Sequence, residues 1–214
     1  MHFIPEDLDD YVVQHSEDEP LLLQQLTRET FQKILQPRML SGHYQGRLLS
    51  IISKLVKPKN ILEIGTYTGY SALCLAEGIQ DKGELHTIDI NEELVDFQRK
   101  YFDKSNHGHQ IYQHLGNALE IIPKLNKTFD LVFIDADKEN YVNYFNIVID
   151  KVTKGGIILS DNVLWSGKVL DTEFKKDDTS TPALVAYNKL LKEDDRIETV
   201  LLPIRDGLTI SRKI

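Results

Sequence analysis

With 214 residues, of which 41% are hydrophobic and 27% charged, the chain is expected to form one globular domain. Its formal net charge of −8 makes nucleic acid a weak candidate partner, because a protein that follows phosphates needs a basic face. The single cysteine, Cys74, excludes an internal disulfide and suits a reducing compartment, and no apolar run reaches the roughly 18–20 residues of a membrane span.

Residues 1–56 are expected to form helices that precede the main fold. Residues 1–7 lack the charged-then-apolar pattern of a signal peptide, so the cytoplasm is the expected location. A partial helical stripe stops near Pro37 and consists of Leu26, Phe31, Ile34 and Leu35. A second helix is predicted over 43–56, and its inward face is expected to carry Leu48, Ile52, Leu55 and Val56. Such helices can cover the sheet, close over a ligand or form a subunit interface.

From residue 60, short apolar runs alternate with helical patterns, which predicts right-handed βαβ units and a mostly parallel sheet. The expected strands are 60–64, 84–89, 110–114, 130–134 and 156–160. A turn into the last of these is predicted at Lys154-Gly155-Gly156. After the fourth strand, the stripe of an amphipathic helix consists of Tyr141, Tyr144, Phe145 and Val148.

The last part of the chain departs from this alternation. Thr181 as N-cap and Pro182 at the first helical position predict a helix. Strands are then predicted over 196–202 and 208–212, joined by only about five residues, which is too short for a parallel crossover. These two strands should therefore be antiparallel. The charged segment 171–178 is expected to be a mobile surface loop.

A glycine turn follows the first strand. Gly65 and Gly69 allow a ligand to approach the backbone closely, although the same spacing also occurs in ordinary tight turns. Glu63, just before the turn, disfavours a pyrophosphate and suits a ligand with hydroxyl donors or positive charge, such as S-adenosylmethionine. Asp89 ends the next strand, close to the roughly 20-residue spacing of an acid that binds ribose hydroxyls; its alternative role is a helix N-cap. Ala118 leaves room for a flat adenine ring.

Oxygen-bearing side chains follow the fourth and fifth strands. Asp135, Asp161 and Asn162 favour Mg²⁺ or a similar hard ion if their strands are neighbours; alternatively, Asp161 caps a helix and Asn162 serves a turn. Lys138 lies one helical turn after Asp135, where it is suited to act as a base, although most lysines at helix starts are simply solvated. Trp165 could form a wall for a planar aromatic substrate or be ordinary packing.

Four motifs in this order and spacing resemble the cation-dependent class I O-methyltransferases of the catechol and caffeoyl-CoA type. They are Glu-Ile-Gly-Thr-Tyr-Thr-Gly-Tyr-Ser, Phe-Ile-Asp-Ala-Asp-Lys-Glu-Asn-Tyr, Asp-Asn-Val-Leu-Trp-Ser-Gly and Asp-Gly-Leu-Thr-Ile-Ser. The resemblance implies a class I methyltransferase Rossmann-like α/β fold, with a seven-stranded mostly parallel sheet, an antiparallel last strand and helices on both faces. It also implies a homodimer, whose interface residues 1–56 could supply.

The resemblance assigns site residues by position. S-adenosylmethionine is expected to be held by Ser41, Glu63, Gly65, Thr66, Ser71, Asp89, Ala118 and Asp137. A divalent cation (Mg²⁺, or another such as Mn²⁺ or Ca²⁺) is expected on Asp135, Asp161 and Asn162, with Lys138 as the catalytic base. The substrate is expected beside Trp165 and Ser166.

One departure affects the expected substrate. The plant enzymes carry a longer Tyr- and Arg-rich segment that holds the coenzyme A ester, whereas here the shorter, acidic segment 171–178 takes its place. We therefore predict metal-dependent methyl transfer to one hydroxyl of a small catechol. The alternative enzyme is a transfer-RNA hydroxyuridine O-methyltransferase, which the acidic balance disfavours. A non-catalytic nucleotide-binding regulator is the rival from another class, and it would need neither the metal ligands nor Lys138.

Overall fold

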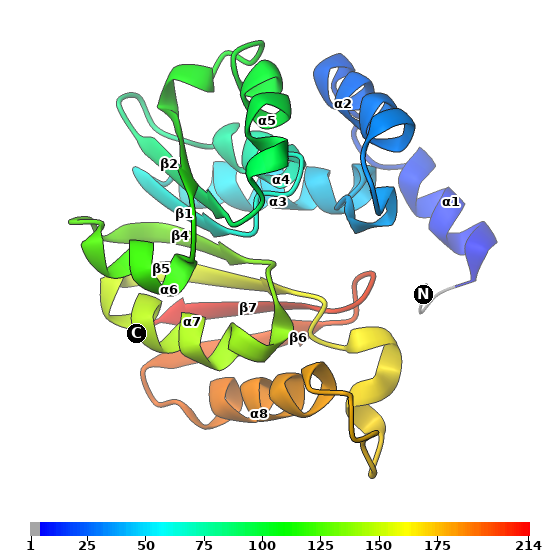
Figure 1. Cartoon of the computed structure of the whole chain (residues 1–214), viewed down its shortest axis with the longest axis vertical. Coiled ribbons are helices and arrows are strands. Elements are labelled where there is room, and N and C mark those ends of the chain that lie inside the picture. Colours follow the sequence, from blue (N-terminus) through cyan, green and yellow to red (C-terminus); the bar gives the residue numbers. More distant parts are fainter. Residues whose placement is uncertain (1–4) are drawn as a thin grey trace.

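A computed structural model describes residues 5–214, and within them a single seven-stranded sheet carries helices on both faces (Figure 1). The order of the strands across the sheet is β3-β2-β1-β4-β5-β7-β6. Their bounds are β1 (Asn60–Ile64), β2 (Glu84–Asp89), β3 (Ile111–Leu115), β4 (Phe129–Ile134), β5 (Val152–Asp161), β6 (Ile197–Leu202) and β7 (Leu208–Lys213). The helices are α1 (Glu6–Gln14), α2 (Leu21–Lys33), α3 (His43–Val56), α4 (Tyr70–Ala76), α5 (Val95–Phe102), α6 (Ala118–Ile121), α7 (Tyr141–Val148) and α8 (Ser180–Glu193).

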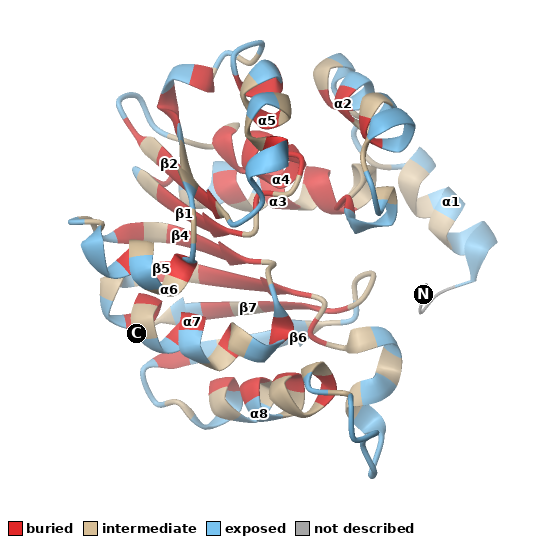
Figure 2. Ribbon diagram, in the orientation of Figure 1, coloured by how far each residue is buried: buried red, intermediate tan, exposed pale blue. Residues whose placement is uncertain are grey.

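The predicted class of fold is confirmed. The five strands β1 to β5 are parallel to one another, and β7 is antiparallel to both β5 and β6. Burial on both sides explains why the apolar strand runs are nearly continuous: one core lies between the sheet and α3, α4 and α5, and the other between the sheet and α7 and α8 (Figure 2). Since β7 reverses direction, its first residue, Leu208, pairs with Asp161 at the end of β5.

One predicted turn is wrong. Lys154-Gly155-Gly156 lies inside β5 rather than before it, because Phe129 pairs with Val152 while Leu131 already pairs with Ile157. The extra residues of β5 bulge out of the ladder, and Gly155 takes a left-handed backbone with φ +80° that suits glycine at a bulge. The glycine pair therefore marks a bulge.

The predicted inward faces of the first helices need correction. Phe31 lies within α2 but not on its buried face, and it is 61% exposed. α2 ends at Lys33, so Leu35 lies beyond the helix and is 85% exposed. In α3, Leu48, Ile52 and Val56 pack against the core as expected, but Leu55 is 77% exposed. The buried face of α3 is instead partly polar because α4 offers it partners, and it consists of Gln45, Gly46, Arg47, Leu49, Ser50 and Ser53.

Three further local predictions can be compared with the structure. α8 begins at Ser180, and the carboxylate of Asp178 accepts from the backbone N–H of Thr181, so Asp178 rather than Thr181 serves the helix start. The stripe of α7 is confirmed, since Tyr141, Tyr144, Phe145 and Val148 are all buried. The segment 171–178 is irregular and mostly exposed. Residues 1–4, part of the stretch in which no signal peptide is expected, lie outside the described residues.

Candidate active site

A cavity of about 1280 Å³ opens at the carboxyl ends of β1, β2, β4 and β5. Ligands bind at this edge in open α/β sheets, and the volume exceeds the roughly 300–1,000 Å³ of a pocket for one small molecule. The part of the chain that precedes the sheet contributes to its wall from Leu35 to Ser41. The cavity can therefore hold two small ligands side by side.

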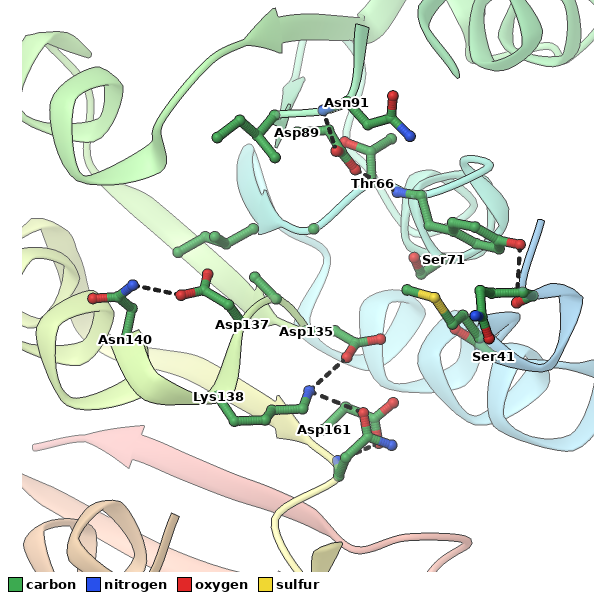
Figure 3. Close-up of a pocket in the computed structure, with 18 of the residues that line it drawn as sticks. Ser41, Thr66, Ser71, Asp89, Asn91, Asp135, Asp137, Lys138, Asn140 and Asp161 are labelled. Atoms are coloured by element: carbon green, nitrogen blue, oxygen red, sulfur yellow. Dashed lines mark hydrogen bonds and ion pairs between the residues drawn. The ribbon is translucent and has the colours of Figure 1, made fainter. Parts of the chain in front are cut away.

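Almost every predicted site residue lines this one cavity (Figure 3). Those that do are Ser41, Gly65, Thr66, Ser71, Asp89, Ala118, Asp135, Asp137, Lys138, Asp161, Asn162, Trp165 and Ser166. The exception is Glu63, which is fully buried beneath the glycine turn. Their individual roles stay predictions, but the structure brings these residues together.

The glycine turn is shaped by a close contact between two strand ends. Gly65 has φ +97°, and a Cβ built on it would lie 1.9 Å from the backbone oxygen of Asp135. Beyond the turn, Asp89 is held at both carboxylate oxygens, which accept from the backbone N–H groups of Tyr67 at 2.7 Å and Asn91 at 2.9 Å. The acid at the end of β2 is thus fixed in place at the wall of the cavity.

We expect Gly65→Ala to destabilise the protein more than a glycine replacement that only strains the backbone. A left-handed backbone at a non-glycine residue costs about 1–3 kcal/mol, and here the new methyl group would also push the Asp135 carbonyl away. Gly167→Ala is the matched control, because Gly167 has φ +82° and nothing lies within 4 Å of its added Cβ. Urea unfolding measures both variants; equal losses would contradict the role of the Asp135 contact.

Burial changes the expected state of Glu63. Desolvation raises the pKa of Glu63 to about 8, from an ordinary value of 4.5, although hydrogen bonds from Ser71 and Thr87 act in the opposite direction. The hydroxyl of Thr87 donates to Glu63 Oε2 at 2.5 Å. In the ligand-free protein the protonated carboxyl therefore dominates near pH 7, which differs from the carboxylate assumed in the sequence analysis.

This raised pKa predicts a pH dependence of stability. The folded protein holds the Glu63 proton to about pH 8 and the unfolded chain loses it near pH 4.5, so the free energy of unfolding falls as the pH rises through this window. Glu63→Gln has no such proton to lose, and its melting temperature should fall less between pH 5 and pH 8 than that of the wild type. Glu173→Gln, at an exposed residue, is the control. The assignment would be contradicted if the melting temperatures of Glu63→Gln and the wild type fell equally with pH, or if Glu173→Gln reduced the fall as much as Glu63→Gln.

Asp137 is held by two neighbours on the cavity wall. The hydroxyl of Tyr144 donates to Asp137 Oδ1, and the side-chain amide of Asn140 donates to Asp137 Oδ2. Figure 3 shows Asp137 and Asn140 joined in this way. Because Tyr144 comes from α7, the core of the protein fixes the position of this carboxylate.

The predicted metal ligands lie together because β4 and β5 are neighbours, with Ile134 paired to Ser160. Lys138 Nζ lies 3.0 Å from Asp135 Oδ1 and 3.0 Å from Asn162 Oδ1. It also donates to the hydroxyl of Tyr141 at 2.6 Å. Lys138 is only 8% exposed, so a buried amine joins the ends of the two strands (Figure 3).

Asp161 is a buried carboxyl group with its hydrogen bonds made. Its Oδ2 accepts from the side-chain amide of Gln45 at 2.6 Å, and its Oδ1 accepts from the backbone N–H of Asn162 at 2.8 Å. Burial, and then repulsion from Asp135, raises the pKa of Asp161 to about 6, while Lys138 and Gln45 lower it. Two carboxyl groups thus crowd one small region, which a divalent cation would relieve.

The structure does not present a complete metal centre. Among residues 5–214 no cluster of three or more His, Cys, Asp or Glu side chains could hold a metal ion. The predicted set contains only two such residues, because its third member is an asparagine. The carboxylate oxygens of Asp135 and Asp161 and the amide oxygen of Asn162 nevertheless suit a hard divalent cation. The repulsion between the two carboxyl groups also favours a cation between them.

The segment after β5 has an unusual backbone. Asn162, Trp165 and Ser166 have φ of 57°, 48° and 56°, in the left-handed region that non-glycine residues rarely adopt. Asp206 holds the segment in this shape, since its carbonyl accepts from Leu164 N–H at 2.9 Å and its carboxylate accepts from Ser166 N–H. Backbone strain of this kind is common at ligand sites. In this conformation, the centroid of the Trp165 ring lies 6.0 Å from Lys138 Nζ.

Some residues of the site were not singled out from the sequence. Tyr141 was read only as part of a helical stripe, although its hydroxyl contacts Lys138. Gln45 and Arg205 were not identified because their partners lie far along the chain; the contact from Gln45 to Asp161 spans 116 residues. No spacing rule reveals such contacts.

Comparison with known proteins agrees with this geometry, since residues 13–214 match the O-methyltransferase family. The chain belongs to the O-methyltransferase family. It is 38% identical over 206 residues to a caffeoyl-CoA O-methyltransferase of Petroselinum crispum, covering 92% of this chain and 85% of the relative. It is also 35% identical to caffeoyl-CoA O-methyltransferase 1 of Arabidopsis thaliana, covering 98% of this chain and 85% of the relative.

Solved structures of other O-methyltransferases are similar as well. The SAH-bound methyltransferase PaMTH1 of Podospora anserina has a TM-score of 0.88 and 30% identity, over 100% of this chain and 98% of its own. The O-methyltransferase of Bacillus cereus in complex with SAH has a TM-score of 0.89 and 26% identity, over 97% of each chain.

This O-methyltransferase is therefore an S-adenosylmethionine-dependent enzyme of the caffeoyl-CoA type. The predicted family, fold and enzyme class are confirmed. No helix between Pro5 and Ile214 is both long and apolar enough to span a membrane.

Proposed function

We propose that this O-methyltransferase moves the methyl group of S-adenosylmethionine to one hydroxyl of a vicinal aromatic diol, with a divalent cation on Asp135, Asp161 and Asn162. The observation that carries this proposal is the position of Lys138, 3.0 Å from both Asp135 and Asn162, in the same cavity as the glycine turn. A regulator that only binds a nucleotide has no use for a buried amine between strand-end oxygens.

The donor is proposed to lie along the glycine turn. Asp89, fixed by two backbone N–H groups, is oriented to accept from ribose hydroxyls, and Ala118 leaves space for the adenine. Asp137, fixed by Tyr144 and Asn140, is the next oxygen along this wall. Ser41 closes the cavity from the side of α3.

The acceptor is proposed to lie between Lys138 and Trp165. The indole offers an apolar face to an aromatic ring, and Lys138 takes the proton of the hydroxyl that is methylated. A divalent cation, if bound on Asp135, Asp161 and Asn162, would supply positive charge that acidifies the diol. The acceptor oxygen then takes the methyl group from sulfur, and the protein contributes mainly orientation and electrostatics.

Charge near the cavity mouth favours a small acceptor. The segment 171–178 carries more acidic than basic residues and lies between two cavity-lining residues, Lys168 and Ser180. Its carboxylates disfavour the phosphates of a coenzyme A ester or of transfer RNA. A free catechol brings no such charge.

A substrate panel tests the proposal. The acceptors are caffeic acid, its monomethylated form ferulic acid, caffeoyl-CoA and a transfer-RNA transcript, each assayed with Mg²⁺ and with excess EDTA. We expect methylation of caffeic acid that EDTA abolishes, and no reaction with ferulic acid because it lacks the second hydroxyl. Preference for caffeoyl-CoA or transfer RNA would replace the proposed acceptor, and full activity in EDTA would remove the cation.

Donor binding gives an independent prediction. Calorimetry should show S-adenosylmethionine binding without added metal, because no proposed metal ligand belongs to the turn between Gly65 and Gly69. It should also bind more tightly than NAD, whose pyrophosphate would meet the acidic side chains of Asp89 and Asp137. Tighter binding of NAD, or an absolute metal requirement for donor binding, would contradict this prediction.

A further inference from the structure

A chain of hydrogen bonds connects the loop between β6 and β7 to Asp161. The guanidinium of Arg205 donates from Nη1 to Gln45 Oε1 at 2.8 Å, and Gln45 Nε2 donates to Asp161 Oδ2 at 2.6 Å. Gln45 is 2% exposed, and its bond to Asp161 is made away from water. They join three parts of the chain that meet only in the folded protein.

The hydrogen-bonding chemistry of Arg205 and Asp161 determines the orientation of the Gln45 side-chain amide between them. Arginine can only donate hydrogen bonds and an ionised carboxylate can only accept them. The amide of Gln45 therefore has one orientation, with its oxygen toward Arg205 and its NH₂ group toward Asp161. Asp161 in turn is held at Oδ2 by this donor and at Oδ1 by Asn162 N–H, which leaves its carboxylate little freedom to rotate.

Arg205 has a second set of partners on the donor side of the cavity. Its guanidinium donates to the backbone carbonyl of Ser41, and to that of Leu40 at 3.4 Å. Its neighbour Asp206 holds the strained segment that carries Trp165. The loop between β6 and β7 thus fixes the donor wall and the acceptor wall at once.

We propose that Gln45 is a positioning residue that orients Asp161 toward the divalent cation, and that Arg205 is a clamp that sets Gln45 and also holds residues 40–41 at the donor. This inference rests on the proposed metal-dependent function. Outer hydrogen-bond partners of metal ligands typically contribute 10–100-fold to metal affinity. A carboxylate that is buried beside Asp135 depends on such a partner to keep one orientation.

Direct binding of Mn²⁺ to the protein, measured by the electron paramagnetic resonance of free Mn²⁺, separates these two roles. With saturating S-adenosylhomocysteine, Gln45→Met should bind Mn²⁺ about 10–100-fold more weakly than the wild type, and its affinity for S-adenosylhomocysteine alone should be unchanged. Arg205→Met should lose affinity for both ligands, because it also releases the carbonyl of Ser41. If Gln45→Met does not fold, Gln45→Asn replaces it as the test. Its side chain keeps an amide but is too short to reach Asp161, so it should show the same loss of Mn²⁺ affinity.

Gln110→Met is the matched control. Gln110 is also buried, and its side-chain amide donates to Gln80 O and Gly83 O. These residues lie just before β2 and β3, at the strand ends away from the cavity. It should bind Mn²⁺ like the wild type. Wild-type affinity in the Gln45 variants, or an equal loss in Gln110→Met, would overturn the positioning role. A wild-type protein that binds no Mn²⁺ would instead refute the metal part of the proposed function, and this inference with it.

Discussion

Asp161→Ala should abolish methyl transfer to catechols. The loss should exceed the roughly 10–100-fold expected for an outer hydrogen-bond partner, because Asp161 is itself a proposed ligand of the cation. Direct Mn²⁺ binding should disappear along with activity, while binding of S-adenosylmethionine persists. Initial rates on caffeic acid, together with calorimetry for the donor, measure these effects.

The same change also has a cost in stability. The sequence alone places Asp161 at a strand end and suggests that it lies outside the core, but the side chain is only 3% exposed. Its removal leaves the buried amide of Gln45 without an acceptor, which costs about 1–3 kcal/mol. Removal of a carboxyl group that repels Asp135 offsets part of this loss. The variant should therefore still fold, with a lower melting temperature.

Asp130→Ala is the control for Asp161→Ala. Asp130 also serves the backbone at a strand end, accepting from the N–H groups of Lys59 and Asn60 at 2.8 and 3.1 Å. It lies near the start of β4, at the amino-terminal ends of the parallel strands and away from the cavity. Its loss should lower stability without abolishing activity. Full activity of Asp161→Ala would remove this residue, and with it the proposed cation site, from the reaction.

Lys138→Ala should lower kcat far more than it raises KM, because a base acts on the way to the transition state. General bases contribute about 10²–10⁴-fold, and we expect the lower half of this range because a bound cation also acidifies the hydroxyl. The deficit should shrink as pH rises, since hydroxide then removes the proton without help. Lys138→Arg should not restore activity near pH 7, because arginine keeps the charge but cannot accept a proton.

The structure adds a complication to the Lys138 experiment. Lys138 also joins Asp135 and Asn162, so its removal can disturb the metal ligands as well as the proton transfer. Mn²⁺ binding to Lys138→Ala distinguishes the two effects: a base requires lost kcat with retained Mn²⁺ binding. Lys151→Ala, which loses only a bond to Leu125 O, controls for the loss of a lysine. Near-wild-type activity of Lys138→Arg at neutral pH would rule out the base.

The sequence predicted the parts of the fold that depend on local pattern. The strands 60–64 and 84–89 were predicted with the observed bounds of β1 and β2. The apolar run of β4 reflects burial on both faces of the sheet. Parallel neighbours end at the same edge, which is why Asp135, Lys138 and Asp161 could be grouped before any coordinates were known. The short link between β6 and β7 likewise fixed their antiparallel pairing.

The failures have a common physical cause, which is tertiary context. Leu48, Ile52 and Val56 of α3 do pack against the core as expected, but Leu55 is exposed. The most buried face of α3 includes polar groups because Glu77, just after α4, binds Arg47 and Ser50. Glu63 was read as a carboxylate open to a ligand, yet the surrounding core buries it completely. The contact from Arg205 to Gln45 spans 160 residues and leaves no trace in local spacing.

The place of β7 between β5 and β6 has a consequence for the making of the protein. Among the strands of residues 5–214, β7 is synthesised last, yet it is the one that joins β6 to the rest of the sheet. Before it emerges from the ribosome, β5 is an open edge with unpaired N–H and C=O groups, and such edges recruit other chains. The loop that carries Arg205 also has no fixed place until β7 is inserted. The nascent protein must therefore stay protected from aggregation until β7 is made. Loss of residues 208–213 would break both the ladder between β5 and β7 and the ladder between β6 and β7.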